Sequence, residues 1–139
     1  MKRFAFPLER VLTYRRNQAD LEQAKLVSLE GEIQKHREEF NGLQASFAEE
    51  VRNVRPNPVD RAELGRYRMV VETKSIRLEQ RIREKQLQVE RQKQVYIQAN
   101  QAAEVLVKVR DKQKKSWEKE LQKELDSLAM DSYLARWKQ

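Results

Sequence analysis

The sequence predicts an all-α protein, a long antiparallel two-helix coiled-coil hairpin whose second helix is longer than the first. The chain of 139 residues has only three glycines and three prolines, too few for the many turns of a sheet fold. Charged residues make up 37% and apolar residues 39% of the chain. The apolar residues are spread evenly, which suits a narrow seam between helices better than a globular core. We therefore expect a single coiled-coil domain over residues 1–139.

The first helix is expected over about residues 8–54. From Leu12 onward every seventh residue is apolar, a spacing typical of a coiled-coil seam, and the series is Leu12, Ala19, Leu26, Ile33, Phe40, Phe47 and Val54. A companion series, offset by three or four residues, is only half apolar and includes His36. Since the chain has one histidine and no cysteine, we interpret His36 as a seam residue rather than a metal ligand.

A turn is expected over residues 55–60. Pro56 and Pro58 remove two backbone donors within three residues, so the first helix must end before them. Asp60 followed by Glu63 resembles a capping box, in which two side chains satisfy the free amides of a helix start. The second helix is therefore predicted from about residue 61 to about residue 137.

The second helix also carries two seven-residue series, one from Leu64 and one from Ile82. Lys85, Gln92 and Arg110 interrupt these series, and we expect the register to fray there. With the turn near Asn57, the first helix should pair with the second only up to about residue 106. The last thirty residues or so would then overhang, exposing apolar side chains that include two tryptophans.

This overhang is the first candidate for a contact with another protein. Its alternatives are that the overhang bends back on the chain or pairs with a second copy.

The net charge of +7 fits an acidic protein, an anionic membrane or nucleic acid as a partner. Acidic residues interrupt the basic clusters, however, so nucleic acid is not expected. The uninterrupted apolar runs are far too short to span a bilayer.

No chemistry is predicted for this chain. The glycines at positions 31, 42 and 65 cannot build either of the common phosphate-binding loops. A two-helix hairpin also offers no cleft that excludes water from converging catalytic groups. We expect no enzyme activity, no cofactor and no metal.

The opening stretch Phe4-x-Phe6-x-Leu8-Glu9-x-Val11-Leu12-x-Tyr14-Arg15 resembles the N-terminus of the FliJ family, and the closing stretch MDSYLARW at 130–137 is similar to the end of that family. These proteins are small soluble components of the bacterial flagellar type III export apparatus. The resemblance implies a cytoplasmic stalk that docks in the hexameric export ATPase ring and couples it to the export gate. It also implies peripheral association with the cytoplasmic side of the inner membrane at the flagellar base, and export chaperones as further candidate partners.

The resemblance also implies which residues make these contacts. Candidates for the ATPase ring lie at the ends of both helices and are Phe4, Phe6, Leu8, Leu12, Arg15, Arg16, Met130, Tyr133, Leu134 and Trp137. Candidates for the export-gate membrane protein follow the turn and are Tyr67, Val70 and Val71. Val71 is also a seam residue in the register given above. For Phe4 and Phe6, the alternative is a hydrophobic staple that fixes the helix start against the second helix near residue 106.

Three other functions remain open from the sequence. The chain could be the corresponding stalk of a virulence-type secretion system, which shares shape and charge. It could also be a basic coiled-coil scaffold that binds nucleic acid, for which steep salt dependence would be diagnostic. An export chaperone, whose client is a secreted subunit, is the third alternative.

Overall fold

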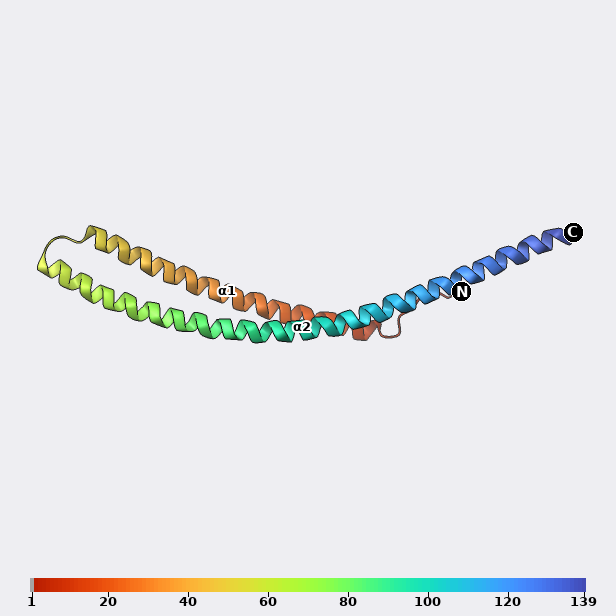
Figure 1. Ribbon diagram of the computed structural model, residues 1–139, viewed down its shortest axis with the longest axis horizontal. Helices are drawn as coiled ribbons and strands as arrows, with labels where there is room; N and C mark the ends of the chain where they lie inside the picture. Colours follow the sequence, from red (N-terminus) through yellow and green to blue (C-terminus); the bar gives the residue numbers. More distant parts are fainter. Residues whose placement is uncertain (1) are drawn as a thin grey trace. The chain divides into compact units, whose positions relative to one another are not determined.

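The computed structural model describes residues 2–139 and contains two long helices joined by a short connection (Figure 1). Helix α1 spans Glu9–Asn53, and helix α2 spans Pro58–Trp137. The helices contain 45 and 80 residues, and no strand occurs between residues 2 and 139. The predicted all-α fold, with a longer second helix, is therefore confirmed, and the predicted bounds of α1 are correct to within one residue.

The packing divides the chain into two compact units, which we describe separately. One unit combines residues 2–20 with Ile97–Gln139, and the other is Leu21–Tyr96 with the turn inside it. In the unit with the turn, three side-chain contacts link α1 to α2, and they join Glu22 to Gln92, Glu32 to Lys85 and Gln44 to Ser75. Positions rise along α1 as they fall along α2, so the two helices are antiparallel here.

The seam of the unit with the turn follows the predicted seven-residue spacing. Ile33 on α1 and Val71, Leu78 and Val89 on α2 are buried, while Leu26, Phe40 and Phe47 are half-buried. Full burial of one such aliphatic side chain contributes about 1.5–3 kcal/mol. The unit is therefore stabilised by a single line of apolar contacts, as the spacing predicts.

Polar residues occupy this seam without disturbing its register, so the predicted fraying at Lys85 and Gln92 is wrong. The Lys85 Nζ atom lies 2.6 Å from Oε2 of Glu32. The Gln92 side-chain amide donates to the Glu22 backbone carbonyl at 3.0 Å and also to the Glu22 carboxylate. Each polar side chain keeps its seam position because the facing helix supplies a partner for it.

These pairs also shift the titration of the two acids. The hydrogen bond from Gln92 lowers the pKa of Glu22 below its ordinary value, with a smaller contribution from Lys25. The hydrogen bond and charge of Lys85 lower the pKa of Glu32. Hydrogen bonds and cations that favour the ionised carboxylate act in this direction.

The turn differs from its prediction at the start of α2. The Asn57 amide donates to the Arg55 carbonyl at 2.7 Å, which closes a tight turn around Pro56. The Asn57 side-chain oxygen then accepts from the amide of Val59 at 3.0 Å. Helix α2 therefore begins at Pro58, and the capping box predicted at Asp60 and Glu63 is wrong.

The physical reason lies in the proline itself. Asn57 is the N-cap, and Pro58 occupies the first helical position, where a residue without an amide proton costs nothing and its fixed φ suits the helix. In the sequence, Pro58 was interpreted only as a helix breaker, so the predicted start of α2 near residue 61 lies three residues later than the observed one.

In the other unit, the start of α1 packs against the middle of α2. Leu12, Ala19 and Ala103 are buried there, and Leu12 has no exposed surface at all. The Glu9 amide donates to the Phe6 carbonyl at 3.2 Å, and the Leu12 amide donates to the Leu8 carbonyl at 2.9 Å. A turn that contains Pro7 therefore leads directly into the first turn of α1.

Candidate functional site

The residues before α1 lie outside both helices, and we call this segment, residues 2–8, the arm. Phe6 in the arm is buried, with 8% of its surface exposed. The ring of Phe4 lies 6.0 Å from the ring of Trp117, centroid to centroid, at a tilt of 49°. The indole N–H of Trp117 donates to the Lys2 backbone carbonyl at 3.1 Å. The arm is thus attached to α2 by one hydrogen bond and by the contact between the Phe4 and Trp117 rings.

This attachment changes where the exposed part of α2 begins. The sequence predicted an overhang from about residue 107, but Trp117 and Leu121 are half-buried. Every residue from 122 to 139 is exposed. We call residues 122–137 the tip, and it is shorter than predicted because the arm covers α2 beyond the start of α1.

The candidate ring-contact residues near the N-terminus fall into two groups. Phe6 and Leu12 contribute to the packing of the unit, whereas Leu8, Arg15 and Arg16 lie on its surface. Tyr14 and Val11 are also exposed, and the Arg15 guanidinium carbon lies 5.9 Å from the centre of the Tyr14 ring. Phe4 is half-buried. The alternative of a staple thus describes Phe4 better, and the contact of its ring on α2 is Trp117.

The tip carries the remaining ring-contact candidates, all of them exposed. Successive residues of an α-helix are about 100° apart around its axis. On this geometry Leu125 and Leu128 continue the face of Leu121, whereas the residues on roughly the opposite face are Met130, Tyr133, Leu134 and Trp137. The rings of Tyr133 and Trp137 are 6.0 Å apart. The tip therefore presents apolar side chains on two opposite faces.

The candidates next to the turn are not placed alike. Val71 is buried with 4% of its surface exposed, as its place in the seam predicted, and Val70 is 48% exposed. Tyr67 is half-buried, and its ring lies 6.0 Å from that of Phe47. Only Val70, with the neighbouring exposed Met69, offers a largely free apolar surface for a partner at this position.

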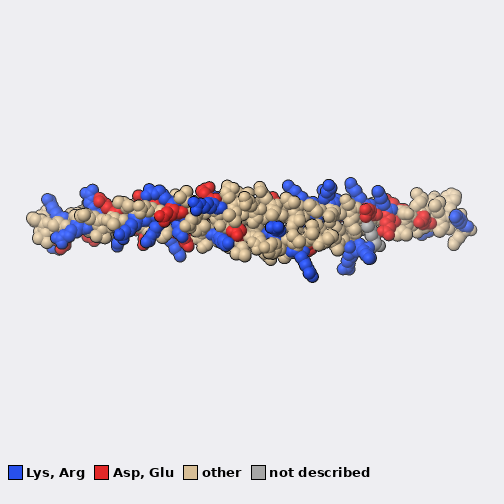
Figure 2. All heavy atoms as spheres, turned by 90° about the horizontal axis from the view of Figure 1, so that it is seen from below, with Lys and Arg blue, Asp and Glu red and all other residues tan. Residues whose placement is uncertain are grey.

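On one face of the molecule, charge is distributed without a continuous stripe of one sign (Figure 2). On the face shown in Figure 2, lysine and arginine side chains are intermixed with aspartate and glutamate. Several acids and bases pair along one helix, such as Arg68 and Glu72 at 3.0 Å. Between residues 2 and 139, no group of three histidine, aspartate or glutamate side chains is placed to hold a metal ion. Neither helix of this described part is long and apolar enough to cross a membrane.

The contact of Trp117 with the arm was not predicted from the sequence. A signal was present, because Trp117 falls on the seven-residue series that also contains Ala103 and Arg110. That series marks the side of α2 facing the N-terminal part of the chain. The missing information was that a non-helical segment, and not only a helix, can cover this side.

Comparisons with protein families, curated protein sequences and solved structures found no significant match to this chain. The fold itself defines a two-helix hairpin with an exposed helical tip.

Proposed function

We propose that the chain is a stalk component of the bacterial flagellar type III export apparatus, which docks its tip in the ring of the export ATPase. The tip carries this proposal. Its apolar residues lie on opposite faces and are all exposed. Exposed apolar side chains on opposite faces of one helix indicate contacts on more than one side. One partner helix would cover one face, whereas the walls of a ring surround both.

The resemblance of the two chain ends to the FliJ family supports the same function. Its N-terminal pattern includes Leu8 and Arg15, which are exposed and accessible to a partner. Arg15 and Arg16 suit acidic groups on an ATPase surface, because guanidinium groups pair well with carboxylates. The similar closing stretch at 130–137 belongs to the tip itself.

Coupling to the export gate is the second part of the proposal. Val70 and Met69 form a small exposed apolar surface shortly after the turn. A contact there with the gate membrane protein would hold the chain at the cytoplasmic side of the inner membrane. Export chaperones are further proposed partners, since they too can bind exposed apolar side chains.

The experiment is a binding assay with purified chain and purified flagellar export ATPase. The tip variant is Leu134→Asp/Trp137→Asp, and both positions are exposed, so helicity measured by circular dichroism should not change. The matched control is Val27→Asp/Leu87→Asp, which places the same charges on exposed apolar positions outside the tip. Wild type and control should bind the ATPase, and the tip variant should bind at least tenfold more weakly.

Equal binding by the tip variant and the control would contradict docking through the tip. The same assay with a virulence-type secretion ATPase tests the closest alternative, because a clear preference for that ATPase would assign the chain to the other system. Failure to bind either ATPase, together with salt-sensitive binding to DNA or RNA, would favour the nucleic-acid scaffold instead.

A further inference from the structure

A groove lies between the arm and α2, on the side of α2 that carries Trp117. It has a volume of about 780 Å³, within the size range of ligand sites in proteins. Phe4 and Ala5 of the arm line it together with Val109 and Trp117 of α2. Because the Trp117 N–H is already bonded to the Lys2 carbonyl, the indole presents only apolar surface to the groove.

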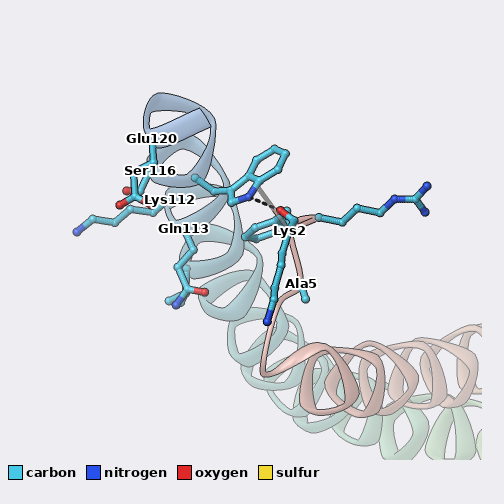
Figure 3. Close-up of a pocket in the computed structure, with 10 residues that line it drawn as sticks. Lys2, Ala5, Lys112, Gln113, Ser116 and Glu120 are labelled. Carbon is cyan, nitrogen blue, oxygen red and sulfur yellow. Dashed lines mark hydrogen bonds between the residues drawn. The ribbon is translucent and has the colours of Figure 1, made fainter. Parts of the chain in front are cut away.

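Charge around the groove is predominantly positive. Lys2, Arg3 and Lys112 line it, against the single acid Glu120. Figure 3 shows Lys112, Ser116 and Glu120 along the α2 edge, while Lys2 and Ala5 lie on the arm. None of the three cations forms an ion pair with another residue between positions 2 and 139. The groove therefore combines an apolar floor with cations on both edges.

The arm also offers free backbone groups. It has no regular secondary structure before Pro7, and among the described residues the backbone groups of Arg3, Phe4 and Ala5 form no hydrogen bond with other backbone groups. A segment whose amides and carbonyls have no backbone partner can offer them to a bound peptide, as sheet edges do in strand addition.

From these observations we propose that the groove binds an extended acidic peptide segment of a partner protein, with one aliphatic side chain anchored on the apolar floor. Carboxylates on either side of the anchor face Lys2, Arg3 and Lys112. The lining residues of α2 run from 109 to 120, which corresponds to about 18 Å of helix. A peptide of five extended residues covers about 17 Å, so five residues fill the groove.

The test uses Trp117 as its own reporter. The chain has two tryptophans, and Trp137→Phe leaves Trp117 as the only one. The probe is a capped five-residue peptide with a central leucine and two glutamates on each side. Its controls are the same peptide with a central glycine and a peptide with lysines in place of the glutamates. We expect a saturable change of Trp117 emission with the first peptide, with half-saturation below about 1 mM.

Matched charge reversals locate the site. Lys112→Glu should weaken binding of the leucine peptide at least fivefold, because it turns an attraction at the groove edge into a repulsion. Lys114→Glu makes the same change of net charge on α2 outside the groove lining and should stay within twofold. The site is refuted by an absence of saturation, by equal losses in the two variants, or by equal binding of the glycine or lysine peptide. No ATPase takes part, so the result is independent of the proposed stalk function.

Discussion

The Lys85 ammonium and the Glu32 carboxylate lie 2.6 Å apart across the seam, on opposite helices. The Glu32 side chain is partly exposed as a whole, but its Oε2 atom, which faces Lys85, is shielded from solvent. A seven-residue apolar repeat fits several alignments that differ by whole heptads. A polar pair fits only one of them, so Glu32 and Lys85 favour the observed alignment at some loss of stability.

Replacing Glu32 and Lys85 with leucines tests whether the pair favours one alignment of the helices at a loss of stability. We expect Glu32→Leu alone to lower the urea midpoint of unfolding, because Lys85 then remains at the seam without its partner. The double variant Glu32→Leu/Lys85→Leu should unfold at a higher urea concentration than wild type, since leucine fills the seam position of Lys85 and the leucine at position 32 packs beside it. A double variant that is less stable than wild type would show that the pair contributes net stability.

Acid should destabilise the chain through Glu22 and Glu32. Both groups have a pKa below the ordinary value in the folded chain, so the unfolded chain binds protons more readily. Their contribution is present above the unfolded pKa of about 4.3 and is lost as pH falls through the lower folded pKa. The urea midpoint should therefore fall below about pH 4.3, and less steeply in Glu22→Gln/Glu32→Gln than in wild type. If the urea midpoint of the variant and that of wild type fall equally steeply with pH, the lowered pKa values of Glu22 and Glu32 are contradicted.

The seam could be predicted from the sequence because a heptad repeat acts through local geometry. Stepping by seven from Leu12 gives residues that are all buried or half-buried, up to Val54. Polar members such as Gln92 could not be assigned in advance, because their place in the seam depends on a partner seventy residues away in the chain.

The candidate site was less predictable than the seam. The exposed tip residues followed from the apolar pattern of the closing stretch, although the tip begins later than expected. The position of the arm could not be derived, because a non-helical segment has no periodicity that shows which surface it covers. Phe6, a ring-contact candidate, is therefore buried, and Leu12 is buried as its place in the predicted seam requires, so neither side chain is free for a partner.

The start of α2 provides a direct test of the corrected cap. Asn57→Ala removes the side-chain oxygen that accepts from the Val59 amide and should lower the free energy of unfolding by about 1 kcal/mol. Asp60→Ala, at the position the sequence suggested, should cost about 0.5 kcal/mol or less, from the loss of a favourable charge in the first helical turn. Urea titrations of both variants measure these changes, and the reverse order would restore Asp60 as the cap.

Because the chain has no cysteine, one introduced cysteine can be labelled with a dye at a single position. Such a dye can measure whether the arm is attached to α2 in solution. A bimane dye on Lys2→Cys would report the arm, since tryptophan quenches bimane on contact and the Lys2 carbonyl is bonded to Trp117. Phe6→Asp should release the arm and raise the emission, because it removes a buried side chain that contributes about 2 kcal/mol. Leu8→Asp is the matched control, since Leu8 is exposed.

Removing Trp117, the quencher, gives the reference emission for these variants. Trp117→Phe in the labelled chain gives the emission of an unquenched dye, and the Phe6→Asp variant should approach that value while the Leu8→Asp variant stays near the original one. If Phe6→Asp leaves the emission quenched, the Phe4 ring and the Lys2 carbonyl hold the arm without Phe6. If the parent chain is already unquenched, the arm is not attached in solution, and the groove proposed to bind an acidic peptide is absent with it.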